Sequence, residues 1–163
     1  MSVFPCQTQD YISFHDTSVD PKLRLPPSMD RLMPIRYQPD YNAHIAYITG
    51  QRCDNFDDCV QLIKAQGKDV SRRLHEINDY RGVELDIAAD QVEELADLNR
   101  KLYANIKDIR FAVVVDTGLG YGMSRMFDVY LDNTVEFEIF EDYNEALTWV
   151  QEAARRDLDG DTR

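Results

Sequence analysis

The stretch Ile109-Arg110-Phe111-Ala112-Val113-Val114-Val115 decides the fold class of this sequence. Its nearly continuous apolar run, rich in β-branched residues, is typical of a central strand that is covered on both faces. We expect such a strand to lie parallel to a neighbour, because helical crossovers cover both faces of a parallel sheet. The segment Thr134 to Phe140 instead alternates apolar and polar residues, which predicts a half-exposed or edge strand.

Upstream of the central strand the sequence predicts a hairpin, two helices and one weaker strand. Met33–Gln38 and Ala43–Thr49 are extended segments separated by turn-forming residues, which is typical of a β-hairpin. The helices are expected at residues 54–67, capped by Asp54 or Asn55, and between residues 86 and 106, where Asp90 and Glu93 resemble a capping box. The weaker strand covers residues 73–77.

Downstream, two more helical patterns flank the alternating strand. After the glycine-rich stretch 117–122 we predict a helix with an inward face formed by Met123, Met126, Phe127, Tyr130 and Leu131. Residues 142–150 predict a closing helix, with a capping box at Asp142 and Glu145. The order β-β-α-β-α-β-α-β-α predicts an α/β protein with a mixed sheet of about five strands and about four helices, in which an antiparallel hairpin is continued by βα units.

The chain divides by composition into three parts. Residues 1–32 hold four prolines and no sustained apolar period, which predicts an irregular N-terminal arm. Residues 33–153 hold the patterned α/β domain, and Met33 is a candidate alternative start. Residues 154–163 are polar, and we expect a flexible tail.

The charge balance narrows the classes of partner. The chain of 163 residues has a formal net charge of −12, concentrated between Asp79 and Leu98 and between Glu136 and Glu145. Such surfaces repel phosphates and anionic head groups, so we expect no nucleic-acid binding and no membrane-surface binding. A solvated acidic face is the ordinary interpretation, and a docking surface for a basic partner is the alternative.

Other sequence features bear on the compartment. We find no apolar run long enough for membrane insertion and no secretory leader pattern. The three cysteines, Cys6, Cys53 and Cys59, are odd in number and lack CxxC spacing, so we expect neither a disulfide framework nor a zinc site. These features favour a cytoplasmic protein in a reducing compartment.

Two segments carry a resemblance to a known family. The segments are Tyr121-Gly122-Met123-Ser124-Arg125-Met126-Phe127 and Phe140-Glu141-Asp142-Tyr143-Asn144-Glu145-Ala146-Leu147-Thr148-Trp149. Together with the element order, they resemble the SpoIIAA-like, STAS/SEC14-type family of small bacterial proteins, over about residues 33–153. The resemblance implies the fold of anti-sigma-factor antagonists, and most members of the family have no assigned activity.

This sequence departs from the family pattern in two places. Phosphorylatable antagonists carry a serine or threonine after the strand that here ends near Ile77, whereas residues 78–86 contain neither. We therefore do not expect a phosphoserine switch of that type. The family also tends to place an apolar residue before the acid within this strand, where the present chain has His75 before Glu76.

A candidate cleft lies at the carboxyl ends of the predicted parallel strands. Its residues are Asn78, Asp79, Tyr80, Thr117, Gly118, Gly120, Gly122 and Arg125. Glycines between a strand and a helix can hold an anion, but the spacing is G-x-G-x-G rather than G-x-G-x-x-G, so a tight βα turn is the favoured interpretation. Arg125 either faces the cleft or forms a structural ion pair with an acid such as Glu76.

Other candidate sites have ordinary structural interpretations. The histidines His15, His44 and His75 are scattered without ligand spacing, so no metal site is predicted, and no cofactor is implied. Cys59 is interpreted as a small core residue. The methionine and aromatic residues of the helix after Gly122 either line a small apolar pocket or belong to the core, and the core interpretation is favoured.

Two functional hypotheses follow from the sequence. The leading one is a non-enzymatic regulatory or protein-interaction module that docks a protein partner or a second copy, as a homodimer, through a sheet edge such as Val135–Ile139. The alternative is a small-molecule, anion or lipid-binding protein that uses the candidate cleft. No defensible catalytic constellation is visible, so an enzyme is not predicted.

Overall fold

The computed structural model describes residues 35–50, 53–116 and 118–160 of the chain. The predicted arm, residues 1–32, lies outside these ranges, as do Thr117 and residues 161–163. The elements, in chain order, are β1 Arg36–Asp40, β2 Ile45–Thr49, β3 Cys53–Asn55, α1 Phe56–Asp69, the 3-10 turn η2 Val70–Arg72, β4 His75–Asp79, β5 Glu84–Asp86, α2 Ala89–Tyr103, β6 Arg110–Val114, α3 Gly118–Leu131, β7 Glu136–Phe140 and α4 Tyr143–Gly160.

The described residues form an α/β fold with four α-helices and a mixed five-stranded sheet. The strand order is β1-β2-β4-β6-β7; β1 and β2 are antiparallel, and every other neighbouring pair is parallel. The predicted fold class and the hairpin followed by βα units are confirmed. A second, two-stranded parallel sheet joins β3 and β5. The sequence did not predict it, because two three-residue strands with acidic side chains carry no apolar signal.

Strand position follows hydrophobic pattern. All five residues of β6 are buried, and β6 pairs in parallel with β4 and β7, as its apolar run predicts. The alternating strand β7 lies at one edge of the sheet, as expected. Pro39 lies in β1 at the opposite edge, where a strand tolerates a residue without a backbone donor.

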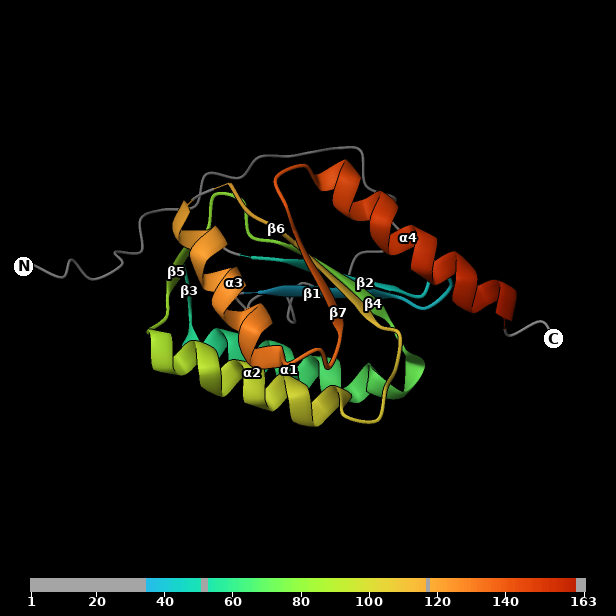
Figure 1. The fold of residues 1–163 in the computed structure, drawn as a ribbon, viewed down its shortest axis with the longest axis horizontal. Coiled ribbons are helices and arrows are strands. Elements are labelled where there is room, and N and C mark those ends of the chain that lie inside the picture. Colours follow the sequence, from blue (N-terminus) through green and yellow to red (C-terminus); the bar gives the residue numbers. More distant parts are fainter. Residues whose placement is uncertain (1–34, 51–52, 117, 161–163) are drawn as a thin grey trace, which may run out of the picture. The chain divides into compact units, whose positions relative to one another are not determined.

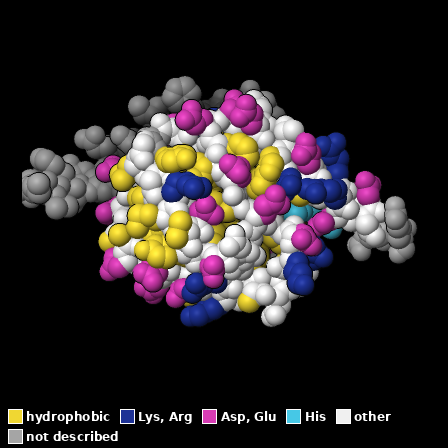
Figure 2. All heavy atoms as spheres, viewed as in Figure 1, with side chains coloured by type: hydrophobic (Ala, Val, Ile, Leu, Met, Phe, Trp, Pro, Cys, Tyr) yellow, Lys and Arg dark blue, Asp and Glu magenta, His cyan; other side chains and the backbone are white. Residues whose placement is uncertain are grey.

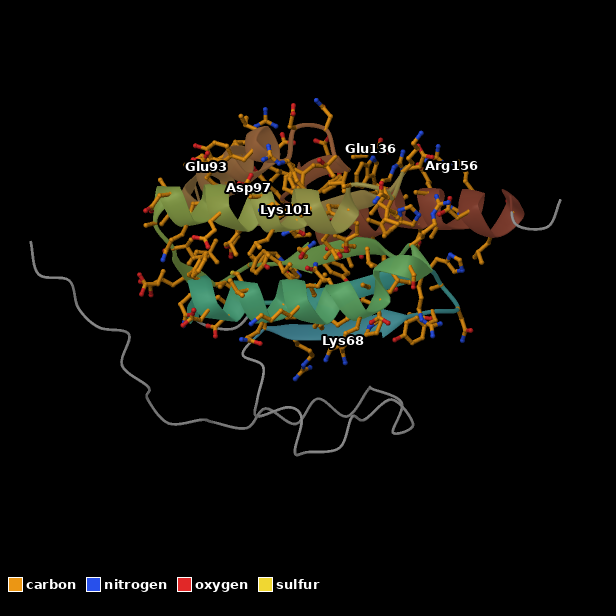
Figure 3. All side chains as sticks on the ribbon, turned by 90° about the horizontal axis from the view of Figure 1, so that it is seen from below. Lys68, Glu93, Asp97, Lys101, Glu136 and Arg156 are labelled. Atoms are coloured by element: carbon orange, nitrogen blue, oxygen red, sulfur yellow. The ribbon has the colours of Figure 1, made fainter. Side chains whose placement is uncertain are left out.

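Helices cover both faces of the sheet (Figure 1). On one face α4 packs Ala146, Val150 and Ala154 against a cluster that includes Ile77 and Val114. On the other face lie α1, α2 and α3, and in Figure 3 α1 and α2 run side by side with Glu93, Asp97 and Lys101 along α2. We call the face covered by α1, α2 and α3 the three-helix face.

The alternation of β4 between the two faces places its polar residues. Successive side chains of a strand point to opposite faces. His75 reaches toward Asp157 of α4, and Ile77 packs in the α4 cluster. Glu76 contacts Gln66 of α1 on the three-helix face. A buried carboxyl therefore lies in the middle of the sheet, beneath α1 and α2.

Two of the predicted caps are present, and one is wrong. Asn55 accepts from the backbone N–H of Asp58, whose carboxylate accepts in turn from the Asn55 N–H, so α1 begins with a capping box. Asp142 accepts from the backbone N–H of Glu145 at the start of α4. The box expected at Asp90 and Glu93 does not form, because the N-cap of α2 is Ala88, two residues earlier than Asp90, and Gln91 accepts from the Ala88 N–H.

Helix ends differ from the predictions at α3 and α4. The glycines expected in a βα turn form the first turns of α3, where the packing of α3 along α2 offsets their low helix propensity. The tail predicted at residues 154–163 is wrong for residues 154–160, because α4 continues to Gly160. Ala154 is buried against the sheet, and Asp157 lies 3.8 Å from Arg73 and 3.3 Å from His75, so this helical turn has partners in the body.

Candidate functional site

A cavity of about 120 Å³ lies on the three-helix face, between the sheet and the helices α1, α2 and α3. We call it the helix-side pocket. Its apolar lining comes from α1, α2, α3 and two strands of the sheet, β6 and β7, together with Leu85 of β5 and the nearby Ile87. The apolar lining residues are Cys59, Leu62, Ile63, Leu85, Ile87, Val92, Leu95, Phe111, Val113, Met123, Phe127 and Phe137. The polar lining residues are Gln66, Glu76, Asn78, Tyr80, Asn99 and Ser124.

Glu76 is the central polar group of the pocket and is only 1% exposed. The Nε2 group of Gln66 donates to both of its carboxyl oxygens, at 2.9 Å to Oε1 and 2.8 Å to Oε2. The Tyr103 hydroxyl donates to Oε1 at 2.6 Å. Burial raises the pKa of Glu76 to about 7, although hydrogen bonds from Tyr103, Asn78 and Gln66 partly oppose the shift. The carboxyl therefore changes charge near neutral pH.

Two buried acceptors on the pocket wall have no hydrogen-bond partner. They are Oε1 of Gln66 and Oδ1 of Asn99, whose side chains are 3% and 4% exposed. The other end of each amide is held: Gln66 Nε2 by Glu76, and Asn99 Nδ2 by the Leu95 carbonyl oxygen at 3.1 Å. Unpaired buried acceptors are uncommon in folded proteins, since each costs the free energy of its lost hydration. Both residues line the helix-side pocket.

The remaining titratable groups around the pocket stay neutral at physiological pH. Burial, with the nearby Glu76, raises the pKa of Tyr103 far above its ordinary value, and burial does the same for Tyr80. Burial also raises the pKa of the Cys59 thiol to about 12, which keeps it protonated and unsuited to act as a nucleophile. Glu76 is therefore the group whose charge changes here.

The structure brings together only part of the predicted cleft. Asn78 and Tyr80 line the helix-side pocket. Asp79 points away from it and holds Arg81 through two hydrogen bonds, at 2.9 and 2.7 Å. The backbone N–H of Gly82 donates to both carboxylate oxygens of Asp116, so the ends of β4 and β6 are bridged by acidic side chains. This environment offers an anion no advantage.

The α3 members of the predicted cleft lie mostly outside the pocket. Gly118 and Gly122 are exposed, and a Cβ added at either would meet no atom within 4 Å. Gly120 is buried, and Thr117 falls outside the described residues. Arg125 is exposed and forms a structural ion pair, as one of its two interpretations expected, but the partner is Asp128 at 3.0 Å, one turn along the same helix, and not Glu76.

Sequence reasoning missed most of the polar lining. Neither Gln66 nor Asn99 was predicted as a site residue, and the role considered for Glu76 was an ion pair with Arg125. A signal was present, since Asn99 and Tyr103 share a helix face with Val92 and Leu95, where polar atoms are rare. Met123 and Phe127 line the cavity, whereas Phe127, Tyr130 and Leu131 pack in a buried cluster with Phe111, so the pocket and the core interpretations each hold for part of this helix face.

A second buried polar cluster ties α4 to the sheet on the opposite face. The Arg110 guanidinium donates to both oxygens of Glu136 and to the Trp149 carbonyl oxygen, and lies 4.5 Å from the centre of the Trp149 ring. The Arg110 backbone N–H donates to Nδ1 of His75 at 3.1 Å. Arg110 has protein partners for its guanidinium and its backbone N–H, and His75 Nε2 lies 3.3 Å from Asp157 Oδ2, which is typical of a structural network.

Over the described ranges, no three His, Cys, Asp or Glu side chains gather as metal ligands. No helix within those ranges has the length and apolarity needed to cross a bilayer. Comparison with family models, curated proteins and solved structures gave no match.

Proposed function

We propose that this protein binds a small, mainly apolar molecule in the helix-side pocket and does not act on it chemically. The observation that carries the proposal is a cavity of about 120 Å³ with two buried, unpartnered acceptors on its wall, Gln66 Oε1 and Asn99 Oδ1. Ligand sites are concave and mostly apolar, with a few convergent polar groups that fix orientation. The helix-side pocket has this composition, whereas the cleft predicted at the carboxyl ends of the strands does not.

The size of the cavity limits its occupant. An engineered apolar cavity of about 150 Å³ in another protein takes up benzene, so a cavity of 120 Å³ accepts a core of roughly one aromatic ring. Longer ligands must extend toward the open side, near Leu85 and Ile87. A long acyl chain requires outward movement of α3 or of the β5 segment.

The methionines provide a direct test of binding. Met123 lines the pocket and Met126, on the same helix, does not. In protein labelled with ¹³C at the methionine methyl groups, titration with toluene is expected to shift the Met123 methyl signal and leave the Met126 signal in place. Toluene that shifts neither signal at saturating concentration contradicts the proposal.

A pair of adjacent substitutions controls this test. Ser124 is buried on the pocket wall, whereas Arg125 is exposed, so Ser124→Met narrows the cavity and Arg125→Met does not. We expect toluene binding to be lost in Ser124→Met and retained in Arg125→Met. Equal toluene affinity in both variants would place the binding site elsewhere.

A second candidate function is the regulatory or protein-interaction role expected from the sequence. Of the five large exposed hydrophobic residues in the described ranges, Leu119, Tyr121 and Val129 lie on α3, and Figure 2 shows hydrophobic side chains gathered over this helix. The adjacent strand β7 also leaves one edge of the sheet unpaired within the described fold. The mixed sheet agrees with the fold expected of SpoIIAA-like proteins, and we propose that kinship together with this role.

Self-association gives this second candidate a simple test. Light scattering is expected to show a homodimer that Val129→Lys disrupts. Gln61→Lys adds the same charge at an exposed site on α1, and we expect it to leave the dimer intact. A monomer at every concentration tested would remove the homodimer from consideration.

A further inference from the structure

The hydrogen-bonding groups on the pocket wall are unbalanced toward acceptors. Glu76 accepts at Oε1 from Tyr103 and Gln66 and at Oε2 from Gln66, with the Asn78 amide as a further nearby donor, whereas a carboxylate has about four lone-pair positions. Gln66 Oε1 and Asn99 Oδ1 add two further acceptors without partners. The amide donors of Gln66, Asn78 and Asn99 and the Tyr103 hydroxyl are engaged with Glu76 or with backbone carbonyl oxygens. The other hydroxyls of the lining belong to Tyr80 and Ser124. A complementary ligand must therefore bring donors.

The acceptors belong to one region of the pocket. Gln66 Oε1 is bonded to the same carbon as the Nε2 that contacts Glu76, so it lies close to the carboxyl. Asn99 lies one helical turn before Tyr103, whose hydroxyl is 2.6 Å from Glu76 Oε1. Residues four apart on a helix share a face, so Asn99 and Tyr103 lie on the same face of α2, and Asn99 and Glu76 both line the pocket.

Glu76 has no cationic partner among the residues that line the pocket. The titratable groups that face it are Tyr103 of α2, Tyr37 of β1 and Tyr80 after β4, and none of these becomes positively charged. Cys59 of α1 also lines the cavity, and no Lys, Arg or His belongs to its described lining. A buried carboxylate is costly unless a positive group pairs with it. A cationic ligand would supply that missing charge.

We propose that the ligand of the helix-side pocket is a small amine, with its ammonium group on Glu76, Gln66 Oε1 and Asn99 Oδ1 and an aromatic or branched apolar body between the helices. This inference rests on the proposed binding function. An ammonium group has three donors and no acceptor, and the wall offers the matching set. An alcohol offers one donor, and a carboxylate is repelled by Glu76.

Four compounds of similar size separate the contribution of charge from that of apolar burial: benzylamine, benzyl alcohol, benzoate and toluene. Each is titrated into the full-length protein at pH 8, with the Met123 methyl signal as the readout. We expect benzylamine to bind at least about ten-fold more tightly than benzyl alcohol, because hydrogen bonds to a charged group are the stronger kind. Benzoate is expected to bind most weakly.

The pH dependence tests the role of Glu76 without any mutation. An alkylammonium keeps its charge from pH 5 to pH 8, whereas Glu76 gains a proton as the pH falls below about 7. We therefore expect the preference for benzylamine over benzyl alcohol to shrink at pH 5. Glu76→Gln should remove this preference at pH 8 while toluene still binds, and Glu93→Gln on the exposed side of α2 should leave it intact.

The outcomes distinguish the two proposals. If toluene shifts the Met123 signal but benzylamine has no advantage at pH 8, the amine inference fails and the pocket function stands. If none of the four compounds shifts the Met123 signal, the pocket function itself fails. A benzylamine preference that persists unchanged at pH 5 also overturns the assignment to Glu76.

Discussion

Replacing Glu76 by glutamine is expected to stabilise the free protein at neutral and alkaline pH. Burial of this carboxyl raises its pKa from 4.5 to about 7. The folded state therefore binds a proton more tightly than the unfolded state, and the free energy of unfolding falls as the pH rises from about 4.5 to about 7. Below about pH 4.5 Glu76 is protonated in both states and its ionisation does not lower the free energy of unfolding. Above about pH 7 the whole decrease is present.

The size of the effect follows from the shift. At ~1.4 kcal/mol for each pKa unit, a change from 4.5 to about 7 corresponds to about 3 kcal/mol at pH 8. Glutamine keeps an oxygen that accepts from Tyr103. A rotated Gln66 amide can then accept the new N–H through the oxygen that lacks a partner in the wild type. We therefore expect Glu76→Gln to gain roughly 2 to 3 kcal/mol at pH 8 and little at pH 4.

Urea unfolding followed by circular dichroism measures this gain. Wild type, Glu76→Gln and the exposed control Glu93→Gln are compared at pH 4, 6 and 8. Since the proteins share every other titrating group, the difference between their pH profiles isolates the substituted carboxyl. Parallel profiles for wild type and Glu76→Gln would refute the claim that Glu76 ionises while buried.

Three further substitutions test the surrounding network. Tyr103→Phe removes a donor from the Glu76 carboxylate, so the pKa of Glu76 is expected to rise further in an NMR titration and the free energy of unfolding to fall by about 1 to 2 kcal/mol. Burial lowers the pKa of His75 and the nearby Asp157 partly restores it, so Asp157→Asn should lower the pKa of His75 further. The same substitution should speed hydrogen exchange in the last turn of α4. Unaltered exchange would show that the contact between Asp157 and His75 does not anchor the helix. Because the pKa of His75 is lower in the folded state, the unfolded state binds a proton more readily. The free energy of unfolding therefore falls as the pH drops below about 6.5. Arg110→Lys keeps the charge but loses the paired hydrogen bonds to the carboxylate of β7, and we expect a loss of about 1 to 3 kcal/mol in thermal unfolding, whereas an unchanged melting temperature would contradict the structural role of the cluster.

The fold was largely predictable because its signals are local. The uninterrupted apolar run of β6 and the alternation of β7 each report how many faces of the strand are covered. The small β3–β5 sheet was not predictable, since its strands are short and acidic and form through pairing across the chain. The length of α4 was underestimated because Asp157 gains its partners, Arg73 and His75, only in the folded state.

The site was much harder to predict than the fold. The glycines after β6 and the carboxyl ends of the strands led to the predicted cleft. In the structure acidic side chains bridge these strand ends, and Arg125 pairs with Asp128 on the exposed side of α3. The pocket arises where α1, α2 and α3 meet over one face of the sheet, and no single segment carries that geometry. The position of Asn99 on an apolar helix face is a sequence signal, but its connection with Glu76 appears only in the fold, where both side chains are buried and line one cavity.

A ¹³C NMR titration of the Glu76 side-chain carboxyl, in free protein and in protein saturated with benzylamine, most directly tests whether an ionisable group lies within reach of a ligand in the pocket. The account predicts a midpoint near pH 7 in the free protein, as burial requires, and a clearly lower midpoint with the amine bound. A free-protein midpoint near 4.5, or a midpoint that benzylamine does not move, would contradict it.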